Sequence, residues 1–155
     1  MSSADLSRFS FVIGKWSAVM TTHPECYGDR AGKAAAEISC VWGAARQWIE
    51  CRTRAPLPGG QEYEVLVVIN TAKRPGASLQ AYAVNVSGEG YLYLGRWSSG
   101  DDRIEFEGVL DAQGAHRQIV AYERLGGGGV GFNVRETRDR GDKYIPHSSA
   151  IWTAA

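Results

Sequence analysis

The sequence predicts an all-β protein: an antiparallel up-and-down barrel of about 8–10 strands with a short helical segment at its N-terminus. Turn-forming residues recur at strand-length intervals, apolar and polar residues alternate between them, and helical periodicity is nearly absent. Consecutive hairpins need no crossover connections, and closing the sheet removes its free edges. A two-sheet sandwich is the main structural alternative.

An aromatic segment near the N-terminus precedes the first expected strand. Residues 3–12 are expected to form one or two helical turns, with Ser2 or Ser3 as the N-cap. The first strand is expected at residues 15–22, ended by His23-Pro24. We expect the lead-in to plug one end of the β-structure.

The next two strands are expected to form a hairpin. Residues 34–41 and 47–54 flank a turn at Gly43, and prolines and glycines within residues 56–60 end the second of them. The strand at 61–70 has the clearest alternation, because its odd positions from 63 to 69 are Tyr, Val, Val and Ile.

Short turns also separate the strands of the second half. The strands expected there are residues 78–86, 91–97, 103–107, 116–125, 129–138 and 144–153. Tyr91, Tyr93 and Trp97 share one face with Gly95, where the small residue leaves room beside the rings. The three glycines at 126–128 have no following lysine and no helix, so they predict a turn and not a phosphate-binding loop.

Length and charge restrict the class of protein. A chain of 155 residues suits a single domain spanning 1–155. Lysine plus arginine (17) equals aspartate plus glutamate (17), so no nucleic-acid or anionic-membrane partner is expected. The sequence contains no apolar run of about 18 residues, so no membrane-spanning helix is expected. The N-terminus lacks the pattern of a signal peptide, so we expect a cytoplasmic location.

The three cysteines are Cys26, Cys40 and Cys51. Their odd number and the absence of a secretion signal argue against a disulfide framework. Cys40 and Cys51 lie on either side of the turn near Gly43, and we expect two buried, reduced thiols there. No spacing typical of a zinc site occurs, so no metal is expected.

The opening segment resembles that of a known family. Phe9-Ser10-Phe11-Val12-Ile13-Gly14-Lys15-Trp16 is similar to the F-x-F-x-x-G-x-W start of the DUF1579-like family of the calycin (lipocalin-like) superfamily. The segment from Tyr91 to Gly108 and the last strand ending at Trp152 also resemble that family. The resemblance implies a lipocalin-like barrel whose closed end is capped by Trp16, and it implies no catalytic residues.

A second resemblance, to nitrobindin-like haem barrels, concerns a late-strand histidine. In those barrels such a histidine ligates iron, and His147, within Pro146-His147-Ser148, occupies a comparable place. The chain departs from that family in its first strand, which has Ser-Ala-Val-Met at 17–20 in place of a glycine-rich, Tyr-Pro-containing segment. No cofactor is therefore expected, and haem bound through His147 is kept as an alternative.

Aromatic side chains are the main candidates for ligand binding, because five tryptophans and seven tyrosines exceed what a small barrel needs as filler. The residues that we expect to line a cavity are Trp48, Tyr63, Tyr82, Tyr93, Trp97, Tyr122 and His147. A satisfied interior or rim position is the competing interpretation for His147.

Four polar residues are candidates for chemistry. Glu37 and Glu50 have apolar neighbours along their strands and would act as bases if they faced the interior. Arg135 would bind a carboxylate or enolate oxygen if its face pointed inward, but the exterior interpretation is favoured. His147 is the fourth candidate, as a general base. His23 and His116 are expected to be solvated.

These observations predict a binding protein for a hydrophobic or aromatic small molecule. The alternative is a lipocalin-like enzyme, a cyclase or isomerase of secondary metabolism acting on a polycyclic, polyketide or terpenoid-type substrate, because such chemistry leaves no sequence motif. The sequence leaves open which ligand is bound, whether catalysis occurs and whether the protein is a homodimer.

Overall fold

A computed structural model describes residues 4–56, 62–100 and 102–155. The expected N-cap at Ser2 or Ser3 and the expected break at 58–60 lie outside these ranges. The helical segments are α1 (Ala4–Arg8), η1 (Phe9–Val12), α2 (Pro24–Tyr27), η2 (Gly28–Arg30) and η3 (Ala44–Arg46). The strands are β1 (Gly14–Thr22), β2 (Gly32–Trp42), β3 (Ile49–Pro56), β4 (Glu62–Thr71), β5 (Leu79–Asn85), β6 (Gly90–Trp97), β7 (Arg103–Val109), β8 (Arg117–Arg124), β9 (Val130–Thr137) and β10 (Ile145–Ala154).

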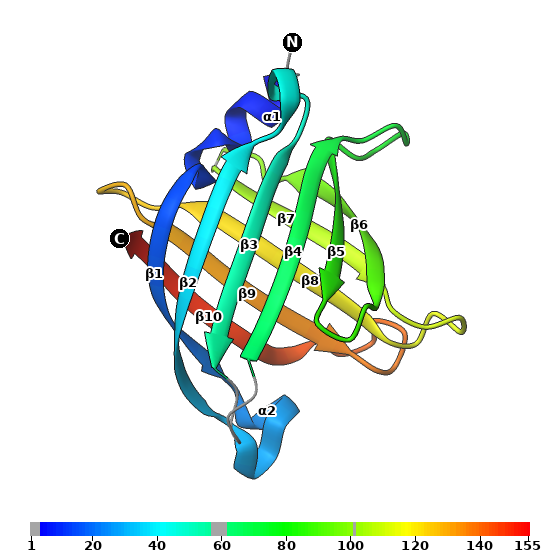
Figure 1. The fold of residues 1–155 in the computed structure, drawn as a ribbon. Coiled ribbons are helices and arrows are strands. Elements are labelled where there is room, and N and C mark those ends of the chain that lie inside the picture. Colours follow the sequence, from blue (N-terminus) through cyan, green and yellow to red (C-terminus); the bar gives the residue numbers. More distant parts are fainter. Residues whose placement is uncertain (1–3, 57–61, 101) are drawn as a thin grey trace.

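The ten strands form one closed barrel (Figure 1). Each strand pairs antiparallel with its neighbours in sequence, and β1 closes the barrel against β10. The predicted up-and-down barrel is therefore confirmed, and the sandwich alternative is wrong. Where the first strand was predicted to end, at His23-Pro24, the chain forms the short helix α2. In the described ranges no helix has the length and hydropathy needed to cross a lipid bilayer.

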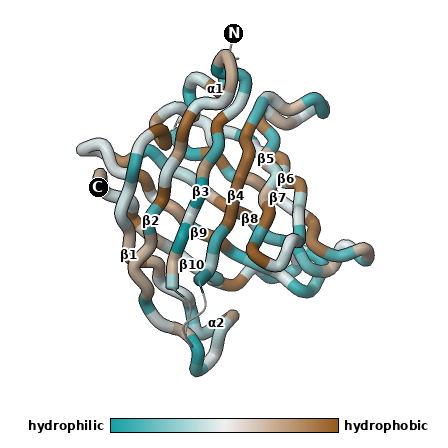
Figure 2. Tube along the Cα trace, viewed as in Figure 1, coloured by the Kyte–Doolittle hydropathy of each residue, from teal (hydrophilic) through white to brown (hydrophobic). Residues whose placement is uncertain are grey.

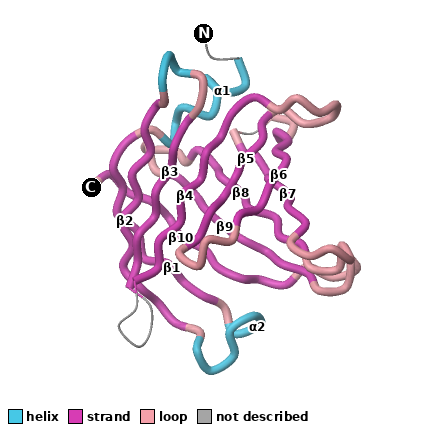
Figure 3. Tube along the Cα trace, turned by 45° about the vertical axis from the view of Figure 1, so that its right-hand side comes forward, coloured by secondary structure: helices cyan, strands magenta, loops and turns pink. Residues whose placement is uncertain are grey.

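Helical segments lie at opposite ends of the barrel (Figure 3). At one end α1 and η1 insert Leu6, Phe9 and Val12, each with no exposed surface. Trp16 lies beneath this plug at the start of β1, and its indole Nε1 donates a hydrogen bond of 2.7 Å to the carbonyl oxygen of Val12. The predicted plug is thus confirmed, and the opposite end carries α2.

Alternation along the strands separates the interior from the outer surface, as the changing hydropathy along each strand shows (Figure 2). On β6 the inward position Gly95 makes room for a ring, as predicted. A Cβ atom added there would lie 2.6 Å from Cε1 of Phe106 on the neighbouring strand β7. The ring of Phe106 therefore occupies the volume that a larger residue at 95 would need.

Cys40 and Cys51 face the interior on adjacent strands. The register of β2 and β3 pairs them directly, with 4.1 Å between their Cα atoms, and the structure joins them as a disulfide. The expectation of two reduced thiols is therefore wrong, because it depended on the expected compartment and not on the pairing register. Cys26, on α2, is a free thiol.

Candidate functional site

The interior differs between its two ends. Towards α1, inward-facing side chains such as Ile69, Leu79 and Phe106 are buried. Towards the middle and the α2 end, inward-facing residues such as Val67 and Val120 keep part of their surface accessible. The inward-facing side chains of the α2 half are therefore less completely covered than those of the α1 half, and we call the space that they surround the lumen.

Tyr63 on β4 shows that this accessible surface is internal. Its side chain faces inward on the same face as Val67, in register with Ala55 of β3, and retains 37% of its surface. Burial nevertheless raises the pKa of its phenol to about 12, with a further contribution from Tyr27. Tyr63 therefore keeps accessible surface on the inward face of its strand, towards the lumen.

Three phenols meet in the lumen. Burial raises the pKa of Tyr122, and the nearby phenols of Tyr93 and Tyr63 add to the shift. The hydroxyl of Tyr93 donates a hydrogen bond of 2.9 Å to Oε1 of Gln118 on β8. Within the described ranges, no side chain or backbone group is hydrogen-bonded to the hydroxyl of Tyr63 or Tyr122. These two hydroxyls can therefore serve a bound molecule.

An ionisable pair lies beside these phenols at the α2 end. Glu136 on β9 is only 6% exposed, and its Oε1 lies 3.3 Å from Nε2 of His116. Its Oε2 lies 3.5 Å from Nε of Arg138. Sequence reasoning missed Glu136 and expected His116 to be solvated. The signal was present, because Glu136 shares the inward face of its strand with Phe132 and Val134.

His147 lies at a bulge in β10 and connects this strand to α2. Its Nε2 is 3.0 Å from the hydroxyl of Tyr27 on α2, and its Nδ1 is 3.0 Å from Oγ of Ser148. A second histidine, His23, hydrogen-bonds through Nε2 to Oγ of Ser149 at 2.9 Å. Tyr27, His147 and His23 thus hold α2 across the mouth of the lumen.

The arrangement around His147 does not fit an iron ligand. Axial ligation requires a ring nitrogen that is free to face the metal, and both ring nitrogens of His147 have protein partners. Among the described residues, no group of three or more histidine, cysteine, aspartate or glutamate side chains is placed to hold a metal ion.

Protonation of His147 is expected to destabilise the folded protein. Burial lowers the pKa of His147 below its ordinary 6.5, although Glu136 opposes the shift. Between the two pKa values the unfolded chain binds the proton more readily than the folded chain. The stability contributed by neutral His147 is therefore present above about pH 6.5 and is lost as the pH falls through the folded pKa.

Urea unfolding at about pH 7.5 and about pH 5.5 tests this prediction. The free energy of unfolding of the wild type is expected to fall more over this interval than that of His147→Gln, whose amide does not titrate. Equal losses in the two proteins would contradict it.

Comparison with known structures agrees with this architecture. The chain is similar to the crystal structure of Rv2717c from M. tuberculosis, with a TM-score of 0.69 and 15% sequence identity, over 100% of this chain and 99% of that chain. The two chains share the fold of a closed barrel. At this identity the likeness concerns the fold alone, so membership of the DUF1579-like family stays a prediction. Comparison with protein-family models and with curated proteins gives no match.

The polar candidates other than His147 lie on the outside of the barrel. Glu37 is exposed on the outer face of β2. Glu50 accepts a hydrogen bond of 2.8 Å from Nε1 of Trp48, and Arg135 forms an ion pair of 2.7 Å with Glu105. Arg135 therefore lies on the exterior, as the favoured interpretation predicted. None of the three faces the lumen, because their strand neighbours supply the inward side chains.

Some of the aromatic candidates lie in the lumen, and the others lie at other surfaces of the barrel. Tyr63, Tyr93 and Tyr122 lie together in the lumen, with His147 at its mouth. Tyr82 faces outward and is 50% exposed. Trp48 lies outside the barrel wall, against Gly43. Trp97 lies at the plugged end, where the guanidinium of Arg8 is 4.1 Å from its ring centroid.

Proposed function

We propose that the barrel binds a small, largely apolar aromatic molecule in its lumen. The observation that carries this proposal is Tyr63. Its inward-facing side chain keeps 37% of its surface accessible, and burial raises the pKa of its phenol. Its hydroxyl has no hydrogen-bond partner among the described residues. A wall residue with these properties is suited to contact a guest molecule. The calycin-like fold is consistent with such a role.

The lining supports an aromatic guest with one polar group. Deep in the barrel, the rings of Phe132 and Trp152 stack with 5.8 Å between centroids, and Tyr122 meets Phe132 edge-on at 5.4 Å. Nearer the mouth are Tyr63 and the pair formed by Glu136 and His116. An apolar ring system would thus lie against the aromatic wall, and a carbonyl or hydroxyl would meet the phenols.

Titration with 8-anilinonaphthalene-1-sulfonate, followed by its fluorescence, tests the proposal. Tyr63→Ala is expected to weaken binding of this probe by about tenfold, because it removes an aromatic wall contact worth about 1.4 kcal/mol. Tyr82→Ala is the matched control, since it removes a tyrosine from the outer face of the neighbouring strand. Equal effects of the two substitutions, or no binding by the wild type, would contradict binding in the lumen.

The pair of His116 and Glu136 favours a second candidate function, an isomerase or cyclase on the same scaffold. Glu136 orients His116 through Nε2, and the described residues provide no partner for Nδ1 of His116. An imidazole placed in this way can accept a proton from a bound substrate. In this case His116→Ala would abolish turnover of a polycyclic substrate while leaving the affinity for the fluorescent probe unchanged.

A further inference from the structure

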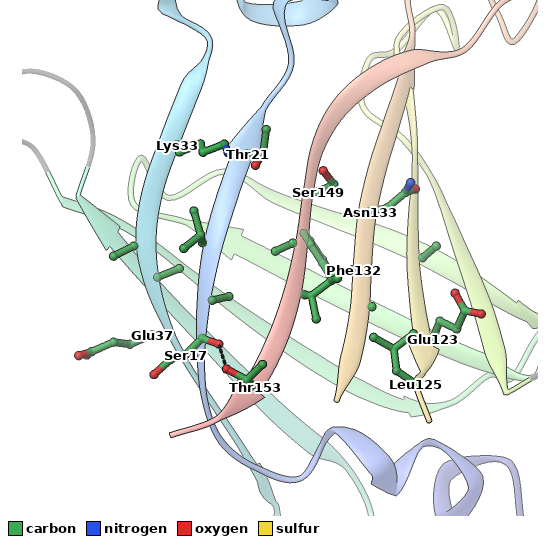
Figure 4. Close-up of a pocket in the computed structure, with 18 of the residues that line it drawn as sticks. Ser17, Thr21, Lys33, Glu37, Glu123, Leu125, Phe132, Asn133, Ser149 and Thr153 are labelled. Carbon is green, nitrogen blue, oxygen red and sulfur yellow. Dashed lines mark hydrogen bonds between the residues drawn. The ribbon is translucent and has the colours of Figure 1, made fainter. Parts of the chain in front are cut away.

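A broad depression lies on the outer surface of the barrel and not in the lumen. It has a volume of about 1040 Å³ and extends over the outer faces of β2, β1, β10, β9 and β8. Figure 4 shows Ser17, Thr21, Ser149 and Thr153 around it. These side chains are small and uncharged, and the charges of the lining come from Lys33, Glu37, Arg103 and Glu123 around them.

The outer faces of other strands are different. On β3 and β4, Arg52 pairs with Glu64 at 2.9 Å and Arg54 pairs with Glu62 at 3.0 Å. Such cross-strand ion pairs are typical of a sheet surface that faces water. The outer faces of β1 and β10 carry no such pair among the described residues.

The centre of the depression is apolar. The register of β1 and β10 pairs Ser17 with Thr153 and Thr21 with Ser149, which places Val19 opposite Ile151. Val19 is 56% exposed and Ile151 is 63% exposed. Two large, adjacent apolar side chains in a shallow depression form the kind of centre that a protein interface buries.

Opposite charges flank this centre on a single strand. Lys33, Ala35 and Glu37 follow one another on the outer face of β2, so the two charges lie about 13 Å apart on either side of Ala35. Neither charge has an ion-pair partner among the described residues. A two-fold axis through Ala35 would bring Lys33 of one copy near Glu37 of the other, and the reverse.

We propose that a second copy of this chain docks on this face, sheet against sheet, about a two-fold axis near Ala35. Val19 and Ile151 form the buried centre, and Lys33 and Glu37 form two equivalent ion pairs at the rim. The self-complementary charges on β2 favour a second copy over a different protein. The chain carries no net charge, so two copies do not repel each other.

Sedimentation equilibrium of the full chain tests the proposal. The wild type is expected to dimerise, and Ile151→Arg to weaken dimerisation by more than about a hundredfold, because each dimer would bury the new charge twice. Val109→Arg is the control, since Val109 is 50% exposed on β7, away from the depression. A monomeric wild type, or equal dissociation of both variants, would overturn the proposal.

Charge reversal tests the two-fold arrangement itself. Lys33→Glu and Glu37→Lys are each expected to weaken dimerisation by about tenfold, since each creates two like-charge contacts at the rim. The double variant restores opposite charges and is expected to recover wild-type association. If the double variant dimerises as weakly as the single variants, the two-fold axis does not lie near Ala35. Circular dichroism melting curves verify that every variant folds.

Discussion

Phe9→Ala is expected to lower the free energy of unfolding by about 3–5 kcal/mol, the range for removing a fully buried phenylalanine ring. Phe9 has no exposed surface, and its ring lies 5.4 Å from that of Tyr122 and 5.9 Å from that of Phe106. Its removal would leave a cavity between the plug and the barrel wall. Urea unfolding followed by circular dichroism measures the loss.

Phe11→Ala is the matched control for this substitution. Phe11 lies two residues further along the same plug and is only half-buried, with its ring 5.5 Å from that of Phe9. The expected loss is about 1–2 kcal/mol, because less surface leaves water when this ring packs. A loss for Phe11→Ala that equals or exceeds the loss for Phe9→Ala would show that the plug is not centred on Phe9.

Ala83→Trp is expected to reduce affinity for 8-anilinonaphthalene-1-sulfonate by about a hundredfold, equivalent to about 2.7 kcal/mol. Ala83 faces inward on β5, between Val67 on β4 and Tyr91 on β6, and keeps part of its surface accessible. An indole at this position would project into the lumen and occupy the volume that a ligand needs. Fluorescence titration of the probe gives the affinity.

The neighbouring residue provides the control for lumen filling. Tyr82→Trp introduces the same side chain one residue earlier, where it points outward. It is expected to leave probe affinity unchanged. Loss of affinity in both variants would place the probe on the outer surface, and unchanged affinity in both would show that ligands do not use the lumen near Ala83.

The barrel itself was predictable because its causes are local. Glycine and proline turns and two-residue alternation specify short antiparallel strands, and short connections leave each strand next to its predecessor. The plug was predictable for the same reason, since an apolar segment without strand alternation precedes Gly14 and Trp16. Gly95 was correctly expected to accommodate a ring, but the ring belongs to Phe106 of the next strand.

The site was only partly predictable. The aromatic residue type pointed to Tyr63, Tyr93 and Tyr122, and the structure brings these three together. It also pointed to Trp48 and Tyr82, which lie outside the barrel wall. Aromatic composition carries no information on which side of the wall a ring will lie. Glu136 shares the inward face of its strand with Phe132 and Val134, and this buried carboxylate was overlooked.

The sequence by itself determined the all-β class, the order of the strands and the plugged end, because each follows from interactions between residues close in the chain. Only the tertiary structure decided the pairing of Cys40 with Cys51, the contact of His116 with Glu136 and the position of α2 over His147. These contacts depend on register, on a bulge in β10 and on closure of the barrel, which are long-range properties that local patterns do not encode.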